Sequence, residues 1–143
     1  MRGLRYVLVV PVLMAIAAPA FAVKPFYDEF KKDYLDTAKD KKFAEMVDKG
    51  DKCLVCHQGK NKKNRNVFGQ EVAKLLTKKD AKNTEKMDGA FKKVLAMHVD
   101  PKDDKSETYL DRLNSGQWPG GKLEELKKDP KKGEGAAKEE KKE

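Results

Sequence analysis

The chain has 143 residues, of which 39% are charged, and its formal net charge at pH 7 is +8. That length allows one domain with appendages, and the charged fraction leaves few residues from which to build an apolar core. Lysines and acids are interspersed and no arginine-rich stripe occurs, so the composition argues against a nucleic-acid-binding protein.

The first 22 residues have the layout of a secretory signal peptide. Arg2 and Arg5 precede an apolar run over residues 6–18, and Ala20-Phe21-Ala22 is a small-x-small cleavage site. An uncleaved membrane anchor is the alternative, but two prolines interrupt a run that is already short for a membrane span. We therefore expect an exported, periplasmic protein that is not embedded in a membrane. Loss of the two arginines lowers its net charge from +8 to +6.

Two helices are predicted before the middle of the chain. Aromatic residues spaced three and four apart favour an amphipathic helix over residues 25–37, whose aromatic face packs either on another helix or on a cofactor. This face consists of Phe26, Tyr27, Phe30 and Tyr34. Phe43, Met46 and Val47 mark a second, shorter helix that ends near Gly50.

Both cysteines and one of the two histidines fall within the five residues Cys53-Leu54-Val55-Cys56-His57. Two thiols at this spacing can add to the two vinyl groups of one porphyrin, and the histidine that follows is then held beside the iron as its axial ligand. We therefore predict one covalent c-type haem, with Cys53 and Cys56 as the thioether donors and His57 as the proximal iron ligand. Export is consistent with covalent haem attachment, and a buried haem would supply apolar surface that the sequence lacks.

Three other interpretations of the C-x-x-C pair have to be weighed. A redox disulfide of the thioredoxin kind should follow a strand, and no strand-like alternation surrounds Cys53. Tetrahedral zinc would need a fourth ligand from His98 or a carboxylate, and joint ligation by the adjacent Cys56 and His57 is sterically awkward. A plain structural disulfide leaves His57 without a role.

A polar loop is predicted over residues 58–66, because this stretch is rich in turn-forming residues. We expect Asn66 to cap the next helix, which carries Phe68, Val72, Leu75 and Leu76 on its apolar face. Gly69 lies in the first turn of that helix, where its small size would permit close approach to another backbone. Basic residues cluster on both sides of the motif in the sequence: Lys49, Lys52, Lys60, Lys62, Lys63 and Arg65.

Two further helices complete the predicted all-α fold. Asn83 or Thr84 begins the first of them, and Asp100-Pro101 stops it. Its predicted apolar side comprises Met87, Phe91, Val94, Leu95 and His98. Ser106 is the expected cap of the last helix, and Gly116 its C′ residue.

The end of the chain is low in complexity. From Lys122 to Glu143 it carries eight lysines against seven acids, and Leu123 and Leu126 are its only large apolar residues. We therefore expect a signal peptide at 1–22, a haem domain at 23–121 and a charged tail at 122–143 that is disordered beyond Leu126.

Taken together, these features resemble a monohaem c-type cytochrome of the broad class I kind. More narrowly, the stretch from Cys53 to Lys60, the sequence Lys63-Asn64-Arg65-Asn66-x-Phe68-Gly69 and the closing Leu-Asn-Ser-Gly-Gln-Trp-Pro are similar to short exported bacterial cytochrome-c-like proteins. The resemblance covers residues 43–119. It implies a small helical domain wrapped around one haem. Class I cytochromes place a methionine ligand in a recognisable context before the last helix, and that context is missing here.

The sixth iron ligand has three candidates downstream of the motif. On a helical wheel His98 is central on the apolar side that includes Met87 and Phe91, and Met97 is marginal. Unwinding of the helix before Asp100-Pro101 would reverse that preference. Met97 and His98 are therefore the two distal candidates, Met87 is a weaker one, and an iron without a sixth protein ligand remains the alternative.

The function expected from the sequence is electron transfer without substrate chemistry, so the protein is not expected to be an enzyme. The basic residues around the motif would attract a redox partner with an acidic docking surface. The competing functions are a haem enzyme or gas-binding sensor with an open iron position, and an exported binding or structural protein in which the cysteines form only a disulfide.

Overall fold

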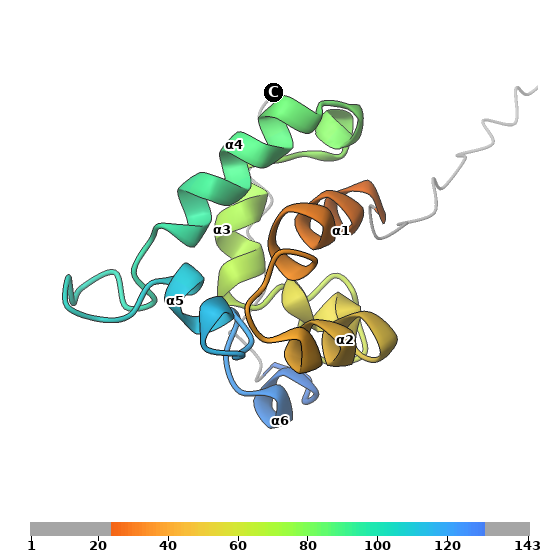
Figure 1. Cartoon of the computed structure of the whole chain (residues 1–143). Helices are drawn as coiled ribbons and strands as arrows, with labels where there is room; N and C mark the ends of the chain where they lie inside the picture. The colour runs from red at the N-terminus through yellow and green to blue at the C-terminus, as the bar shows by residue number, and fades with distance from the viewer. Residues whose placement is uncertain (1–23, 131–143) are drawn as a thin grey trace, which may run out of the picture.

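The computed structural model describes residues 24–130 (Figure 1). This part of the chain folds into six α-helices, and its only β-type pairings are two isolated bridges. The predicted all-α class is confirmed for the described residues. The predicted signal peptide and residues 131–143 of the predicted tail lie outside them.

The longest connections between the helices lie before α3 and before α5. They are α1 (Lys24–Phe30), α2 (Lys41–Lys49), α3 (Val67–Leu75), α4 (Thr84–Leu95), α5 (Tyr109–Asn114) and α6 (Leu123–Leu126). A π-helical turn, η1 (Lys31–Leu35), continues α1, and two 3-10 turns, η2 (Lys52–Val55) and η3 (Lys78–Lys82), precede α3 and α4. The candidate motif therefore begins in η2, directly after α2.

Side-chain caps define where α2, α3, α4 and α5 begin, and at α2 the Asp40 carboxylate accepts from the N–H of Phe43. The side chain of Asn66 accepts from the N–H of Gly69 at the start of α3, which confirms the predicted cap. The predicted start at Asn83 or Thr84 is also confirmed: α4 begins at Thr84, and the side chain of Asn83 caps it by accepting from the N–H of Lys86. The predicted cap of the last helix was wrong. Thr108 caps α5 in a reciprocal capping box with Asp111, because threonine followed three residues later by an acid satisfies two free N–H groups at once.

The aromatic face of α1 packs on other helices. The ring of Phe30 lies 5.8 Å from that of Phe68 on α3 and 5.4 Å from that of Phe91 on α4, both edge to face. Tyr34 also meets Phe91, and α1 lies beside α4 in Figure 1. These rings belong to one continuous apolar core of buried side chains.

A second group of contacts joins the helix before the motif to the end of α5. The ring of Phe43 on α2 lies 5.9 Å from that of Trp118. Gly116 has a φ of +68°, which confirms it as the C′ residue of α5, and a Cβ there would come within 2.7 Å of the Asp40 carboxylate. The segment that closes the domain is thus packed against the start of α2.

The folded part of the chain continues past Gly121, where the sequence analysis placed the end of the domain. Leu126 on α6 is only 2% exposed and belongs to the core. Its backbone carbonyl accepts a hydrogen bond from the N–H of Gly59. Leu123 and Leu126 lie three residues apart on one face of a helix, and this pairing outweighs the charged composition around them.

Candidate haem attachment site

The motif divides into a buried part and a half-buried part. Leu54 and Val55, between the two cysteines, are buried in the core, whereas Cys53, Cys56 and His57 keep part of their surface exposed. The N–H of His57 donates to the carbonyl of Cys53 at 2.9 Å, which keeps the motif in a tight turn. The two apolar residues therefore hold the turn in place, and the three residues with ligand chemistry remain at its edge.

Both cysteines are free thiols. Desolvation by the surrounding protein raises the pKa of the Cys56 thiol to about 12, while the nearby Arg65 acts in the opposite direction. Catalytic cysteines of redox-active C-x-x-C motifs have lowered pKa values, because the thiolate is the nucleophile. At neutral pH the Cys56 side chain is therefore a protonated thiol and not an activated thiolate.

His57 is held through one nitrogen of its ring. Its Nδ1 lies 3.2 Å from the backbone carbonyl oxygen of Asn64, and a β-bridge pairs His57 with Arg65. An Nδ1–H that donates to a carbonyl leaves Nε2 with the lone pair, the arrangement that metal-binding histidines use. Desolvation, aided by Arg65 and Lys62 and opposed by the Asn64 carbonyl, lowers the pKa of His57 and favours the neutral ring that can ligate iron.

Asn66 ties the motif to α3. This side chain is only 2% exposed, and its Nδ2 donates to the backbone carbonyls of Leu54, Val55 and His57 at 2.8, 3.1 and 3.2 Å. Its Oδ1 meanwhile caps α3. The sequence predicted the cap, but it contained no signal for the second role, which depends on how the turn folds back onto the helix.

Gly69 allows α3 to approach the motif closely. A Cβ at this position would lie 1.9 Å from the carbonyl oxygen of Cys56, so no larger residue fits without a backbone shift. The predicted close approach at Gly69 is therefore confirmed. Gly120 allows a similarly close approach to the side chain of Asn66, since a Cβ at this position would lie 2.3 Å from the Asn66 amide nitrogen.

The three distal candidates occupy different surroundings. Met87 is 2% exposed in the core on α4. Because α4 ends at Leu95, Met97 and His98 lie beyond the helix, and the helical wheel does not describe them. Both belong to a short segment that pairs with residues 107–109. Nδ1 of His98 contacts the backbone carbonyl oxygen of Ser106.

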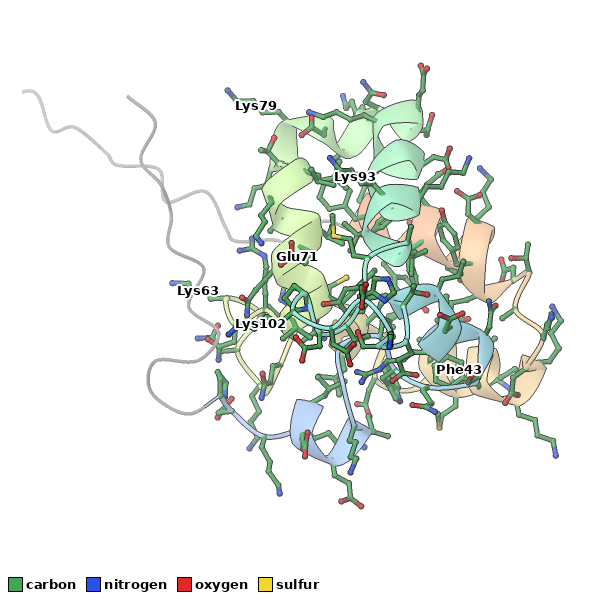
Figure 2. The ribbon with its side chains drawn as sticks, turned by 90° about the vertical axis from the view of Figure 1, so that its left-hand side faces the viewer. Phe43, Lys63, Glu71, Lys79, Lys93 and Lys102 are labelled. Atoms are coloured by element: carbon green, nitrogen blue, oxygen red, sulfur yellow. The ribbon has the colours of Figure 1, made fainter. Side chains whose placement is uncertain are left out.

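Met97 and His98 together line a cavity of about 750 Å³. Tyr109, two residues of α3, Glu71 and Lys74, and the loop over residues 100–104 contribute to its wall. Glu71 and Lys102, both labelled in Figure 2, lie on this side of the molecule. None of Cys53, Cys56 and His57 lines the cavity. Met97 and His98 thus share one cavity wall, to which Met87 and the motif do not contribute.

The basic residues after the motif have no acidic partner among the described residues. Lys60, Lys62, Lys63 and Arg65 form no ion pair there, whereas Lys49 pairs with Glu45 at 2.9 Å. Lys52 lies over the ring of Tyr27, 5.9 Å from its centroid. Figure 2 shows Lys63 extending outward from its loop. The four uncompensated cations give the motif a positive border.

A haem fits the donor chemistry of the motif, because two free thiols and a histidine with an available Nε2 stand at one turn. A zinc site does not emerge from the described residues, since nowhere do three His, Cys, Asp or Glu side chains of residues 24–130 converge to hold a metal ion. No helix in that same range is both long and apolar enough to span a membrane.

Comparison with protein-family models finds no match, and comparisons with curated proteins and with solved structures find none either. The interpretation of the site therefore rests on the residues and contacts described above.

Proposed function

We propose that this protein is an exported electron-transfer protein with a cytochrome-c-like domain that carries one covalent c-type haem. The observation that carries the proposal is the turn at residues 53–57, where two reduced thiols flank two buried anchors and His57 is oriented through Nδ1. A C-x-x-C pair followed by such a histidine matches the requirements of haem attachment.

Each residue of the turn has a separate role in this proposal. The thiols of Cys53 and Cys56 form two thioether bonds, and Nε2 of His57 binds the iron. The carbonyl of Asn64 holds the imidazole ring in its ligating tautomer. When bound, the haem supplies a centre that cycles between ferric and ferrous iron and so accepts and releases one electron.

Partner recognition would use the positive border of the motif. Four cations without acidic partners among residues 24–130 create a local positive potential next to the expected haem edge. An acidic docking surface on a redox protein in the periplasm is the chemistry that fits this border. Electron exchange with that partner should slow as salt is added, because salt screens the attraction.

A second candidate function is binding of a gas or small ligand at an open iron position. The cavity beside His98 favours it, since His98 and Tyr109 both line this cavity and each carries a group that can donate a hydrogen bond. Rapid binding of carbon monoxide by the ferrous protein would support this candidate. Resistance to carbon monoxide would support six-coordinate iron and electron transfer, with Met97 or His98 as the sixth ligand.

The decisive experiment is production of the full-length chain in a host that matures c-type cytochromes in its periplasm. The purified protein should show the mass of one added porphyrin and the pyridine haemochrome spectrum of a haem with two thioether bonds. Cys53→Ser and Cys56→Ser should each shift that spectrum towards one unreacted vinyl group. A wild-type protein of unmodified mass would contradict the proposal and leave the disulfide interpretation.

A further inference from the structure

The C-terminal segment Glu125–Asp129, here called the strap, contacts the chain on both sides of the attachment motif. After the motif, the N–H of Gly59 donates to the carbonyl of Leu126 at 2.7 Å, and the N–H of Lys60 donates to Oδ1 of Asp129 at 3.0 Å. These are backbone donors, so they fix the path of the loop directly.

On the other side of the motif, Nζ of Lys127 lies 2.9 Å from the carboxylate of Asp51. Asp51 precedes Cys53 by two residues, and Gly59 follows His57 by two. The strap therefore connects the two flanks of one five-residue motif. Leu126, buried in the core, anchors its middle.

The fit between strap and loop is tight. Gly59 has a φ of +69°, and a Cβ there would lie 2.1 Å from Oδ1 of Asp129 and 2.8 Å from its Cα. Only glycine adopts this backbone conformation readily and leaves room for the strap. The loop after His57 is thus shaped to receive Asp129.

The strap is linked to the His57 ring indirectly, through Gln58 and the backbone carbonyl of Asn64. The carbonyl of Asn64 accepts from the N–H of Gln58 at 3.1 Å and lies 3.2 Å from Nδ1 of His57. Gln58 is adjacent to Gly59, which the strap holds, and its side-chain amide donates to the carbonyl of Glu125 at 3.4 Å. Displacement of the strap would move Gln58 and with it the carbonyl that orients the imidazole.

We propose that the strap is a positioning element for His57: Leu126 and Asp129 fix residues 58–60, and these fix the Asn64 carbonyl that sets the ring. The inference rests on the proposed function, in which His57 is the iron ligand. Partners in the second layer around a metal-binding histidine orient its ring and tune the metal. The strap would therefore influence the reduction potential without touching the haem.

The test uses full-length Asp129→Ala, which removes the acceptor for the Lys60 N–H, and Asp129→Asn, which keeps an amide oxygen there while removing the charge. Glu124→Ala is the matched control, because it removes one exposed acid from α6 without a recorded side-chain contact. Hydrogen exchange at the Lys60 amide and the ring nitrogen resonances of His57 are measured by NMR. The reduction potential is measured on the haem-loaded protein.

We expect Asp129→Ala to speed exchange at Lys60 about fivefold, as for loss of one exposed hydrogen bond, and to shift the His57 ring resonances and the potential. Asp129→Asn and Glu124→Ala should match the wild type at His57. Gly59→Ala, which pushes a methyl group against Asp129, should shift His57 in the same direction as Asp129→Ala.

Faster exchange at Lys60 with unchanged His57 resonances and potential would overturn the positioning role, as would an equal effect of Glu124→Ala. The two proposals fail separately. A mass spectrum without haem contradicts the proposed function, whereas the Lys60 and His57 resonances judge the strap whether or not haem is attached.

Discussion

The region around the motif and the segment that carries Met97 and His98 are held in contrasting ways. In the first, the carbonyls of all five motif residues accept hydrogen bonds, three of them from the single side chain of Asn66. In the second, the N–H of Tyr109 bonds to the carbonyl of Met97 and that of Val99 to Glu107, and the loop between them closes on itself.

This difference separates the candidate proximal region from the candidate distal region. A histidine set in a fully bonded turn has one orientation, so five residues are enough to define its chemistry. A ligand at the base of a surface loop depends on how that loop settles against the rest of the fold. Substitutions should therefore be costly near the motif and mild near Met97 and His98.

The largest effect is expected from Gly69→Ala. The new methyl group would overlap the carbonyl oxygen of Cys56, a backbone atom that has to shift. Overpacking usually costs about 1–3 kcal/mol of the free energy of unfolding, and we expect a loss above that range here because backbone must move. Gly89→Ala is the control, because nothing lies within 4 Å of a Cβ there, and in a helix interior alanine gains about 0.5–1 kcal/mol over glycine. Urea unfolding of both variants measures the difference. Equal stabilities would show that α3 and the motif are not in close contact.

Asn66→Ala is expected to rank second. It removes a helix cap, worth about 1 kcal/mol, and also leaves buried carbonyls of the motif without donors, which costs about 1–3 kcal/mol further. Asn83→Ala removes an exposed cap alone and should cost about 1 kcal/mol. Thermal and urea unfolding compare the two. An identical loss would mean that Asn66 acts only as a cap.

The sequence predicted the starts of α3 and α4 better than the start of α5. The helix class, the cap at Asn66, the start of α4 at Asn83 or Thr84 and the close approach at Gly69 are confirmed. The start of α5 was misplaced, because the Thr108 and Asp111 capping box competed with Ser106, whose hydroxyl instead bonds to the carbonyls of Asp100 and Asp103.

Contacts between distant parts of the chain could not be predicted. Composition made residues 122–130 resemble a tail, and only the tertiary structure shows Leu126 in the core and Asp129 against Gly59. The helical wheel that placed His98 beside Met87 assumed that the helix continues to residue 98. In the structure α4 ends at Leu95. The identity of the cofactor, the site residues and the sixth ligand remain predictions.

The third prediction concerns the distal candidates. Because Met97 and His98 are partly exposed, Met97→Leu and His98→Gln should each change the free energy of unfolding by less than about 1 kcal/mol. One of the two should nevertheless abolish the low-spin spectrum of the haem-loaded protein, and loss of the long-wavelength band of sulfur-ligated ferric haem would identify Met97. Met46→Leu, at an exposed methionine on α2, is the control. Retention of the wild-type spectrum by both variants would favour another ligand or an open site.

The smallest effect is expected from Asp111→Asn, which tests how the distal segment begins α5. Hydrogen bonds from the backbone and side chain of Thr108 lower the pKa of Asp111 in the folded protein. A lowered folded pKa means that the carboxylate stabilises the fold above its unfolded pKa of about 3.9, and that this contribution disappears as the pH falls through the folded value. The variant should therefore have a slightly lower urea midpoint at pH 6 and a flatter decline below pH 4. Asp104→Asn, in the loop before α5, should follow the wild-type profile, because the Asp104 side chain forms no hydrogen bond or ion pair within residues 24–130. If Asp111→Asn also follows that profile, the box contributes nothing to holding Met97 and His98, and the distal segment depends on its backbone pairing alone.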